Sequence, residues 1–488
     1  MSEIDLVVVG GGTAGCVLAS RLVRERGLRI ALVEPVTVEA PRIDRLRPSR
    51  WIRLLGSSED WSFKTASEPG LAARQLIWPR GRGLGGSSRI NAMIWFPPTS
   101  ADLHSLARAS GGRWSDAALR TAYESIAAVA RPEAPVWLSE TSRLFLASTK
   151  GLEGAEPMLY QRLNRGGRRW LPSEWLPTDN ERLMIVRGTV ERVVWNDDTA
   201  VGVRIHGDQG GFELRAERGV VLAAGTIATP AILMRSGLGN RDELSRIGVD
   251  LRQHVPSLGD HLQDHLIMPV IFETTGSSNG VEPQPNMRDL TRWEVIGAGP
   301  VSSNLAECGG LFEERSIQLH VTPTHYLTYP KQAASSAMTI GVNVTQPQSS
   351  GHLRLVSSRP DVPPEISTNY LSRRIDLERT IQAIHLSRHL ARQPPLREMI
   401  RRELLPGPKR STDDELARAI SRYAQTLYHP VGTCRLGSVV DEHLAIPGTN
   451  RLWVADASIL PQVTVGNPNA SIMMLGWFAA ELLSNQLS

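Results

Sequence analysis

The sequence predicts an α/β fold in two domains, and the N-terminus, the middle and the C-terminus each support this prediction. Leu6–Val9 is a short apolar run, as expected of a buried parallel strand. A glycine-rich turn, a helix over Ala14–Arg26 and a second apolar strand over Arg29–Val33 follow it. Because strand, helix and strand in this order form a βαβ unit, we expect the chain to begin in a parallel sheet.

The glycine-rich turn carries the pattern GxGxxG in Gly10-Gly11-Gly12-Thr13-Ala14-Gly15. Gly10 permits a tight turn, Gly12 lets the backbone approach a pyrophosphate, and Gly15 lets the helix pack against the sheet. The free N–H groups at the helix N-terminus favour phosphate. Glu34 ends the next strand, where an acidic side chain can accept a hydrogen bond from a ribose hydroxyl. These features predict a Rossmann-like dinucleotide site and do not separate FAD from NAD.

Short β-like runs continue between Leu183 and Ala224, and they are typical of a meander that rejoins the main sheet in its last run. The runs are Met184–Arg187, Val190–Trp195, Val201–His206, Phe212–Arg215 and Val220–Ala223. Before them, Ser115 is a suitable N-cap for a helix over Asp116–Ala130.

Residues 266–424 predict a smaller domain of sheet and helix. They contain the β-like runs Met268–Phe272 and Ile317–Thr322, helical stretches near Asp376–Arg392 and Asp413–Gln425, and a loop-like part over Gly276–Arg288. The strand Leu452–Ala455 and the helix Ala470–Leu483 then return to the α/β pattern. We therefore expect residues 1–265 and 425–488 to form the dinucleotide-binding domain and 266–424 to form the substrate-binding domain.

Composition limits the function classes. Apolar residues make up 41% and charged residues 21% of the 488 residues, which excludes wholesale disorder. Cys16, Cys308 and Cys434 lie far apart without zinc spacing, so we expect no metal site and a reducing compartment. The net charge of +4 leaves acidic residues nearly as numerous as basic ones, which argues against a nucleic-acid partner.

No apolar run reaches the roughly 18 residues of a membrane-spanning helix, and we expect a cytoplasmic protein without a transmembrane segment. Arg-rich stretches at Arg42–Arg53 and Arg162–Arg169 leave peripheral contact with a membrane open.

Two further stretches are rich in glycine. Gly81–Asn91 reads GRGLGGSSRIN, which lets main chain approach a planar ligand or forms a flexible surface loop. Gly225–Gly239 begins after an apolar strand and opens a helix with a proline near its first turn. Taken alone, that second stretch is also compatible with a plain strand-turn-helix joint.

Together these motifs resemble the glucose-methanol-choline (GMC) oxidoreductase family. Both family signatures are present, at Gly81–His104 and Gly225–Gly239. Three more family elements follow in order, in Gly259–His265, in Tyr428–Cys434 and in the pair formed by Val454–Ser458 and Gly466–Asn469. The resemblance covers about residues 4–484 and implies the GMC oxidoreductase fold, with a choline dehydrogenase-like alcohol dehydrogenase or oxidase activity.

The resemblance implies that the dinucleotide is FAD. Its cofactor positions match Gly10, Gly12, Thr13, Ala14, Gly15, Glu34, Arg82, Gly85, Gly86, Ser87, Asn91, Val190, Asp456, Ala457 and Asn469. Some family members attach the flavin to a histidine just before the asparagine equivalent to Asn91. Ile90 occupies that place here, so we expect FAD to bind non-covalently.

His429 and Asn467 match the active-site pair of the family. A histidine can accept the hydroxyl proton of an alcohol while the hydride passes to flavin N5. The amide of Asn467 can hold the substrate oxygen, although an Asn-Pro-Asn turn also occurs for conformational reasons. We expect His261 and His265 to be structural.

The resemblance favours oxidation of an alcohol to an aldehyde or ketone, with electrons passing to a quinone or redox carrier. An oxygen-using oxidase, a non-redox lyase of the hydroxynitrile lyase type, and a flavin-binding protein without turnover or an NAD enzyme remain as alternatives. Hydrolysis is not indicated, since neither a carboxylate pair nor a GxSxG elbow is present. Arg162, Arg165, Arg168 and Arg169 either meet an anionic or glycosylated substrate or are solvated surface side chains.

Overall fold

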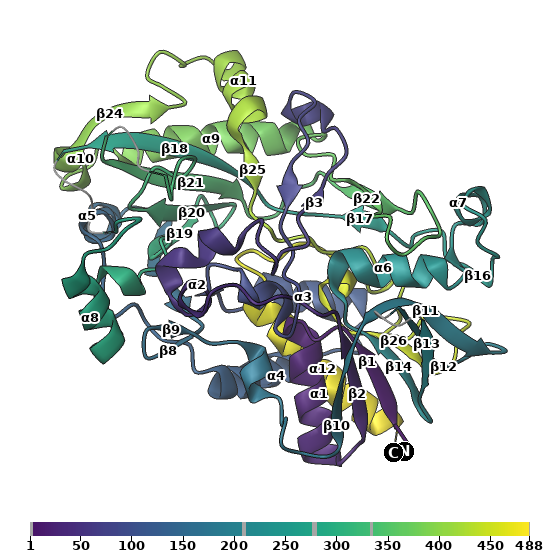
Figure 1. Cartoon of the computed structure of the whole chain (residues 1–488). Helices are drawn as coiled ribbons and strands as arrows, with labels where there is room; N and C mark the ends of the chain where they lie inside the picture. Colours follow the sequence, from purple (N-terminus) through teal and green to yellow (C-terminus); the bar gives the residue numbers. More distant parts are fainter. Residues whose placement is uncertain (1–2, 207–210, 276–280, 332–334, 488) are drawn as a thin grey trace.

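The computed structural model describes residues 3–206, 211–275, 281–331 and 335–487. Two sheets organise these residues: a parallel sheet that holds the N-terminus, and a larger antiparallel sheet that lies above it in Figure 1. The expected α/β architecture with a second sheet-and-helix part is therefore confirmed.

The parallel sheet has the order β10-β2-β1-β14-β26 among the described strands. These strands are β1 (Leu6–Val9), β2 (Ile30–Glu34), β10 (Leu183–Arg187), β14 (Gly219–Leu222) and β26 (Leu452–Val454). In β1, Val7 lies opposite Ala31 on one side and Val220 on the other. Every side chain of β1 is buried, because layers cover both faces of this sheet.

Helices α1 (Thr13–Arg26), α12 (Asn469–Gln486) and α4 (Asp116–Ala130) form the layer beside the parallel sheet, where α12 packs against both of the others (Figure 1). A side chain at Gly476 would meet the carbonyl oxygen of Ala14 at 2.6 Å, so α1 and α12 approach closely there. Ser115 caps α4 as expected, since its hydroxyl accepts a hydrogen bond from the N–H of Ala118.

An antiparallel meander of β11 (Thr189–Asn196), β12 (Thr199–His206) and β13 (Phe212–Arg215) adjoins the parallel sheet. The expectation that Met184–Arg187 also belongs to this meander is wrong, because this run lies in β10 and pairs with β2. Gly188 explains the difference. The chain changes sheets at this residue, whose N–H still bonds the carbonyl oxygen of Glu34.

The larger sheet has the order β24-β18-β21-β20-β19-β6, and β25 also pairs with β18. Its strands are β6 (Ala155–Leu159), β18 (Leu266–Thr274), β19 (Cys308–Phe312), β20 (Ile317–Thr322), β21 (Ala337–Val344), β24 (Ile400–Leu405) and β25 (Gln425–Thr426). Strand β6 comes from the chain before residue 265, which the sequence places in the other domain.

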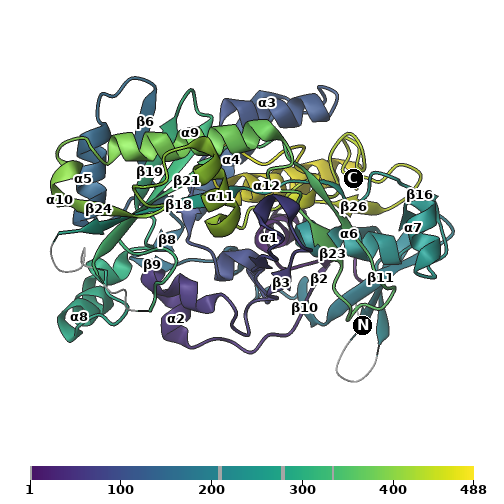
Figure 2. The same cartoon turned by 90° about the horizontal axis from the view of Figure 1, so that it is seen from above.

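Helix α9 (Arg374–Leu390) covers one face of the larger sheet, and Figure 2 shows it running across the strands with α11 (Asp413–Tyr423) beside it. Helix α5 (Glu140–Thr149) packs against β19, β20 and β6. Residues of β18, β20 and β21 line a cavity, so the sheet forms one wall of the space between the two domains.

The expected loop over Gly276–Arg288 is partly wrong. Residues 276–280 lie outside the described ranges, and Met287 and Arg288 begin helix α8 (Met287–Ile296). Asn286 sets this start, because its side chain accepts a hydrogen bond from the N–H of Asp289.

The remaining elements are short. The helices are α2 (Arg42–Leu46), α3 (Ser100–Ala109), α6 (Gly225–Arg235), α7 (Arg241–Arg246) and α10 (Leu396–Met399). The strands are β3 (Phe63–Lys64), β4 (Ile77–Trp78), β5 (Ile94–Trp95), β7 (Gln161–Arg162), β8 (Asn164–Arg165), β9 (Arg168–Arg169), β15 (Leu238–Gly239), β16 (Gln253–His254), β17 (Asp260–Leu262), β22 (Gly351–Arg354) and β23 (Glu365–Ser367). Within the described ranges, no helix combines the length and apolar character needed to cross a membrane.

Candidate active site

A cavity of about 730 Å³ extends from the parallel sheet to the larger sheet. The carboxyl ends of all strands of the parallel sheet reach it, through Val9-Gly10, Glu34-Pro35, Gly188-Thr189, Ala223-Ala224 and Asp456. Ligands of doubly wound sheets bind at this edge. The cavity therefore occupies the place where a dinucleotide is expected.

Three helix N-termini open onto this cavity. Helices α1, α6 and α12 begin at Thr13, Gly225 and Asn469, and these residues line the cavity. At α1 and α12 no side-chain cap hydrogen bond is formed, whereas at α6 the carboxylate of Asp456 accepts the N–H of Gly225. Because uncapped N–H groups and the positive end of the helix dipole attract anions, the N-termini of α1 and α12 fit a pyrophosphate.

The first glycine motif leaves room for a ligand at one position and none at another. A side chain at Gly15 would collide with the carbonyl oxygen of Gly10, so this residue permits close packing of α1. A Cβ at Gly12 would meet only the oxygen of Ala223, at 4.0 Å, and Gly12 lines the cavity. The backbone at Gly12 is therefore open to a cofactor.

Glu34 is buried at the end of β2, and its carboxylate joins two glycine loops. Its two oxygens accept hydrogen bonds from the N–H of Gly11 at 2.6 Å and of Gly83 at 2.9 Å. Burial raises the pKa of Glu34 to about 7, and these two N–H groups oppose the shift. The carboxylate thus fixes both loops and still borders the cavity.

Side chains from three segments meet beside the helix N-termini. The hydroxyls of Thr13 and Ser88 lie 2.8 Å apart, and both donate to Oδ1 of Asn469. The Nδ2 atom of Asn469 is buried without a hydrogen-bond partner among the described groups. This orphan donor at the cavity wall fits a ligand with acceptor atoms.

Asp456 braces the turn that opens α6. Its Oδ2 accepts hydrogen bonds from the N–H of Gly225 and the hydroxyl of Thr229, at 2.8 and 2.6 Å. Its Oδ1 accepts the N–H of Ser458 at 2.8 Å. This carboxylate therefore holds two cavity-lining segments together.

Most of the cofactor positions expected from the sequence line this one cavity. They are Gly10, Gly12, Thr13, Ala14, Glu34, Gly86, Ser87, Asn91, Val190, Asp456, Ala457 and Asn469. Gly15, Arg82 and Gly85 do not line the cavity. Gly85 donates its N–H to the oxygen of Gly11, and the guanidinium of Arg82 lies 4.7 Å from the ring centroid of Trp61.

His429 and Asn467 line the same cavity, and their side chains touch. The backbone N–H of His429 donates to Oδ1 of Asp264 at 2.6 Å. Asp264 is buried and also accepts hydrogen bonds from the hydroxyls of Tyr370 and Thr426. This network fixes the backbone from which the imidazole of His429 projects.

A chain of hydrogen bonds determines the tautomer of His429. Nε2 of His265 lies 2.7 Å from the carbonyl oxygen of Thr345, which can only accept, so this nitrogen carries a proton. Nδ1 of the neutral His265 is then an acceptor, and it lies 3.0 Å from Nδ1 of His429. His429 therefore carries its proton on Nδ1 and has a lone pair on Nε2.

Asn467 approaches that lone pair from the opposite side. Its Oδ1 accepts a hydrogen bond from Nε2 of Gln318 at 3.3 Å, which turns its amide nitrogen toward His429. The Nδ2 of Asn467 lies 3.3 Å from Nε2 of His429. Two independent chains of hydrogen bonds thus agree on a basic nitrogen at the cavity wall.

Burial controls the protonation of the histidines. It lowers the pKa of His429 well below its usual value, and the nearby His265, His320 and Arg80 add to the shift. Burial also lowers the pKa of His265 to about 4. His429 is consequently neutral at physiological pH.

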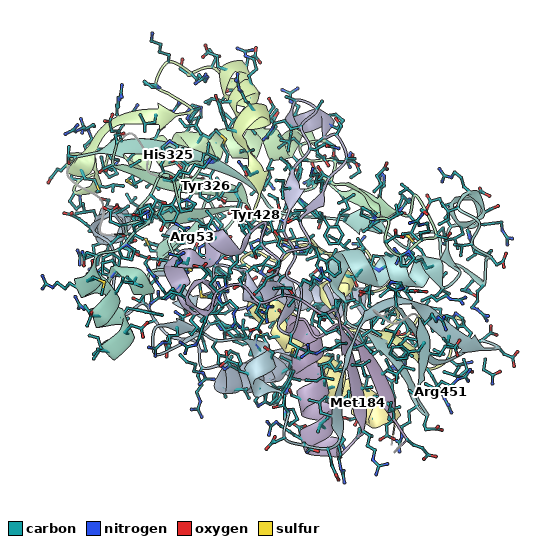
Figure 3. All side chains as sticks on the ribbon, in the orientation of Figure 1. Arg53, Met184, His325, Tyr326, Tyr428 and Arg451 are labelled. Atoms are coloured by element: carbon teal, nitrogen blue, oxygen red, sulfur yellow. The ribbon has the colours of Figure 1, made fainter. Side chains whose placement is uncertain are left out.

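No sequence motif indicated His320 or Tyr326 as site residues. His320 lies on β20, lines the cavity, and has a buried Nε2 without a hydrogen-bond partner in the described structure. Tyr326 lines the cavity beside Tyr428, and the hydroxyls of the two tyrosines are hydrogen-bonded to each other. Figure 3 shows these two tyrosines and Arg53 between the domains, far from Met184 and Arg451 at the other end of the parallel sheet.

Two of the four arginines near residue 165 belong to neither of the two expected classes. Arg162 and Arg169 are buried. Arg162 donates to the oxygen of Ser302, and Arg169 donates to Oδ1 of Asn91 at 3.0 Å. Arg168 stacks on Trp293. Because the guanidinium groups of Arg162 and Arg169 hold protein segments together, they are not available to meet a substrate.

The fold and the cavity define a dinucleotide-dependent oxidoreductase with a histidine–asparagine pair. The N- and C-terminal models of the GMC oxidoreductase family match residues 4–267 and 347–476. The chain belongs to the GMC oxidoreductases, a family of FAD-dependent flavoproteins that act on alcohol-type substrates.

Relatives of this chain include alcohol dehydrogenase [acceptor] of Pseudomonas putida, which is 30% identical over 98% of this chain and 95% of that protein. An oxygen-dependent choline dehydrogenase of Cronobacter sakazakii is 31% identical over 97% of this chain and 94% of that protein. The crystal structure of pyridoxine 4-oxidase from Mesorbium loti superposes with a TM-score of 0.86 at 27% identity, covering 99% of both chains.

Metal ligands are not gathered anywhere in the described ranges, where no group of three or more His, Cys, Asp or Glu side chains could hold an ion. Cys16, Cys308 and Cys434 are each buried and unpaired by disulfides.

Proposed function

We propose that this enzyme oxidises the CH–OH group of an alcohol to an aldehyde or ketone, with His429 as the general base. The observation that carries the proposal is the unprotonated Nε2 of His429 at the cavity wall, where His265 and Asn467 both require a lone pair. A positioned base of this kind contributes roughly 10²- to 10⁴-fold to proton transfer.

The hydroxyl of the substrate takes the place of the Asn467 N–H on the lone pair of His429 Nε2, donates to it and leaves its proton there. Nδ2 of Asn467 donates to the same oxygen and holds the carbinol hydrogen toward the cofactor. The C–H bond breaks with its electron pair, and the C=O bond forms. Bound in the cavity, FAD supplies the acceptor for that hydride.

FAD would be held non-covalently. The N-termini of α1 and α12 and the open backbone of Gly12 would hold the pyrophosphate, and Glu34 would accept a hydrogen bond from the adenosine ribose. Ile90 lines the cavity with a hydrocarbon side chain, which cannot form a bond to the flavin.

We further propose that the electrons leave to a quinone or redox carrier rather than to oxygen. The name of the Pseudomonas putida relative, which specifies an acceptor, supports this choice. Turnover with an artificial quinone and without hydrogen peroxide under air is the expected result. Stoichiometric hydrogen peroxide would identify an oxidase instead.

Stopped-flow absorbance tests the alcohol chemistry. Anaerobic mixing of the flavin-loaded enzyme with a panel of alcohols should bleach the flavin band, and one panel member should give the aldehyde or ketone. A lyase would release its products while the flavin remains oxidised throughout.

A further inference from the structure

We propose that the substrate end of the cavity takes an uncharged alcohol with an apolar body and rejects an ammonium alcohol. This inference rests on the proposed alcohol oxidation and names the substrate class of the same site. It concerns the space that begins at His429 and Asn467 and extends along β20 and the following loop.

Strand β20 gives the direction of this space. Gln318 bonds Asn467, and His320 and Thr322 follow on the same face of the strand because side chains alternate. His320 and Thr322 both line the cavity. A substrate whose hydroxyl meets His429 therefore lays its carbon body beside these two side chains.

Beside His320, much of the wall around that body is apolar or hydroxylated. Ile267 from β18, Leu305, Tyr326 and Tyr329 line it, and a Cβ at Gly341 of β21 would contact Ile267. Such a surface matches hydrocarbon, since burying apolar area releases about 25 cal/mol for each Å². The hydroxyls of Tyr326 and Tyr428 bond each other and do not seek a charged partner.

Carboxylates are confined to the cofactor end. Among the described residues that line the cavity, the acidic ones are Glu34, Asp361 and Asp456. Glu34 and Asp456 end strands of the parallel sheet, and Asp361 is paired with Arg359. None of these acidic residues lies on the larger sheet or its loops beside Tyr326.

The carboxylate next to His429 is already engaged. Asp264 accepts hydrogen bonds from His429, Tyr370 and Thr426, and it is buried outside the cavity lining. Burial raises the pKa of Asp264, and the guanidinium of Arg80 opposes that shift. An ammonium group in the cavity would find no free acidic partner there.

Guanidinium groups also border the same space. Arg80 lines the cavity, donates to the carbonyl oxygen of Tyr428 at 2.6 Å, and faces Asp264 and Asp60. Arg47, Arg50 and Arg53 act on the hydroxyl of Tyr329, and Glu282 acts in the opposite direction. Tyrosine rings can attract an ammonium ion, and the guanidinium groups beside these rings oppose that attraction.

Two alcohols of the same shape isolate the effect of charge. Choline and 3,3-dimethylbutan-1-ol differ in that a carbon replaces the quaternary nitrogen. Removing the unpaired cation should raise kcat/KM for flavin reduction by about tenfold or more in favour of the neutral alcohol. Benzyl alcohol should also reduce the flavin. Equal or better reduction by choline than by its neutral isostere would overturn the inference.

Binding separates this inference from the proposed function. Dissociation constants for the two isosteres, taken from the perturbation of the flavin spectrum, do not need turnover. Tighter binding of the neutral isostere without reduction by any alcohol would support the pocket chemistry and contradict alcohol oxidation. Tighter binding of choline would overturn the inference whatever the activity.

A charge placed on β20 provides the reciprocal test. Thr322→Asp introduces a carboxylate beside the predicted substrate body, and Thr322→Asn introduces an uncharged side chain of the same shape. Thr322→Asp should shift the ratio of kcat/KM toward choline by about tenfold, and Thr322→Asn should leave the ratio near that of the wild type. An unchanged ratio in a folded, flavin-loaded Thr322→Asp enzyme would contradict the placement of the substrate along β20.

Discussion

His429 and His265 are hydrogen-bonded through their Nδ1 atoms, which lie 3.0 Å apart. Two neutral imidazoles can share such a contact only if one carries its proton on Nδ1 and the other does not. The carbonyl oxygen of Thr345 decides which one, because it requires the proton of His265 on Nε2. Thr345, which does not line the cavity, therefore determines through His265 which nitrogen of His429 is basic.

Substitution of His265 tests this positioning role. His265→Asn keeps an acceptor near Nδ1 of His429, whereas His265→Leu leaves that N–H buried without a partner. We expect kcat for His265→Leu to fall about tenfold, the equivalent of one lost buried hydrogen bond, with little change in KM. His265→Asn should retain most of the activity. Equal losses of kcat in both folded variants would contradict a role through the acceptor atom.

The pH dependence of kcat/KM follows from the burial of His429. Burial and the nearby His265, His320 and Arg80 lower the pKa of His429 well below 6.5. A base must be unprotonated, so activity should stay constant as the pH falls through 6.5 and decline only in more acidic solution. Steady-state kinetics with a substrate that does not ionise measures this acidic limb. A midpoint at or above 6.5 would disagree with the buried base.

Stability should fall in acid because of the buried histidines. His320 has a folded-state pKa lowered to about 3, against 6.5 when exposed. Between these values the unfolded chain binds a proton that the folded chain does not, so stability decreases as the pH drops below 6.5. The Tm of the wild type should therefore fall more than the Tm of His320→Gln when the pH is lowered from 7 to 5. The pKa of Glu34 is raised to about 7, so this residue stabilises the fold as the pH falls. Both proteins contain Glu34, and its effect therefore cancels in the comparison.

Gly12→Ala tests the cofactor cradle. The backbone of Gly12 has a φ of −76°, which alanine adopts freely, and its Cβ would enter the cavity with Ala223 O 4.0 Å away. The variant should fold and yet lose most of its flavin. Flavin content after gel filtration and thermal unfolding of the apoproteins give the two readouts. Full flavin loading in Gly12→Ala would show that the pyrophosphate lies elsewhere.

Local patterns predicted the strand ends that hold the cofactor cavity. The GxGxxG turn, Glu34 and the Gly225 turn each follow a continuous apolar run, and such runs are recognisable as buried parallel strands. The assignment of Met184–Arg187 to the meander was wrong, because β-propensity does not specify a partner strand.

The substrate side was harder to predict, since its residues come from distant segments. The signal for His320 was present, because Gln318, His320 and Thr322 place polar side chains on one face of a buried strand. Such alternation identifies a polar face of the strand, but it does not show whether that face lines a cavity or packs against other protein segments. Likewise, a run of arginines reads as surface in sequence, whereas Arg162 and Arg169 are buried with backbone and amide oxygens as partners.

The most direct test of the account compares wild type with His429→Ala in an anaerobic flavin-reduction experiment. We expect both proteins to bind FAD, because His429 contributes no helix N-terminus or glycine to the cradle. An alcohol that bleaches the wild-type flavin should reduce the variant at least about 100-fold more slowly, in line with the loss of a general base. Equal rates of flavin reduction in the two proteins would contradict the central claim that His429 removes the hydroxyl proton.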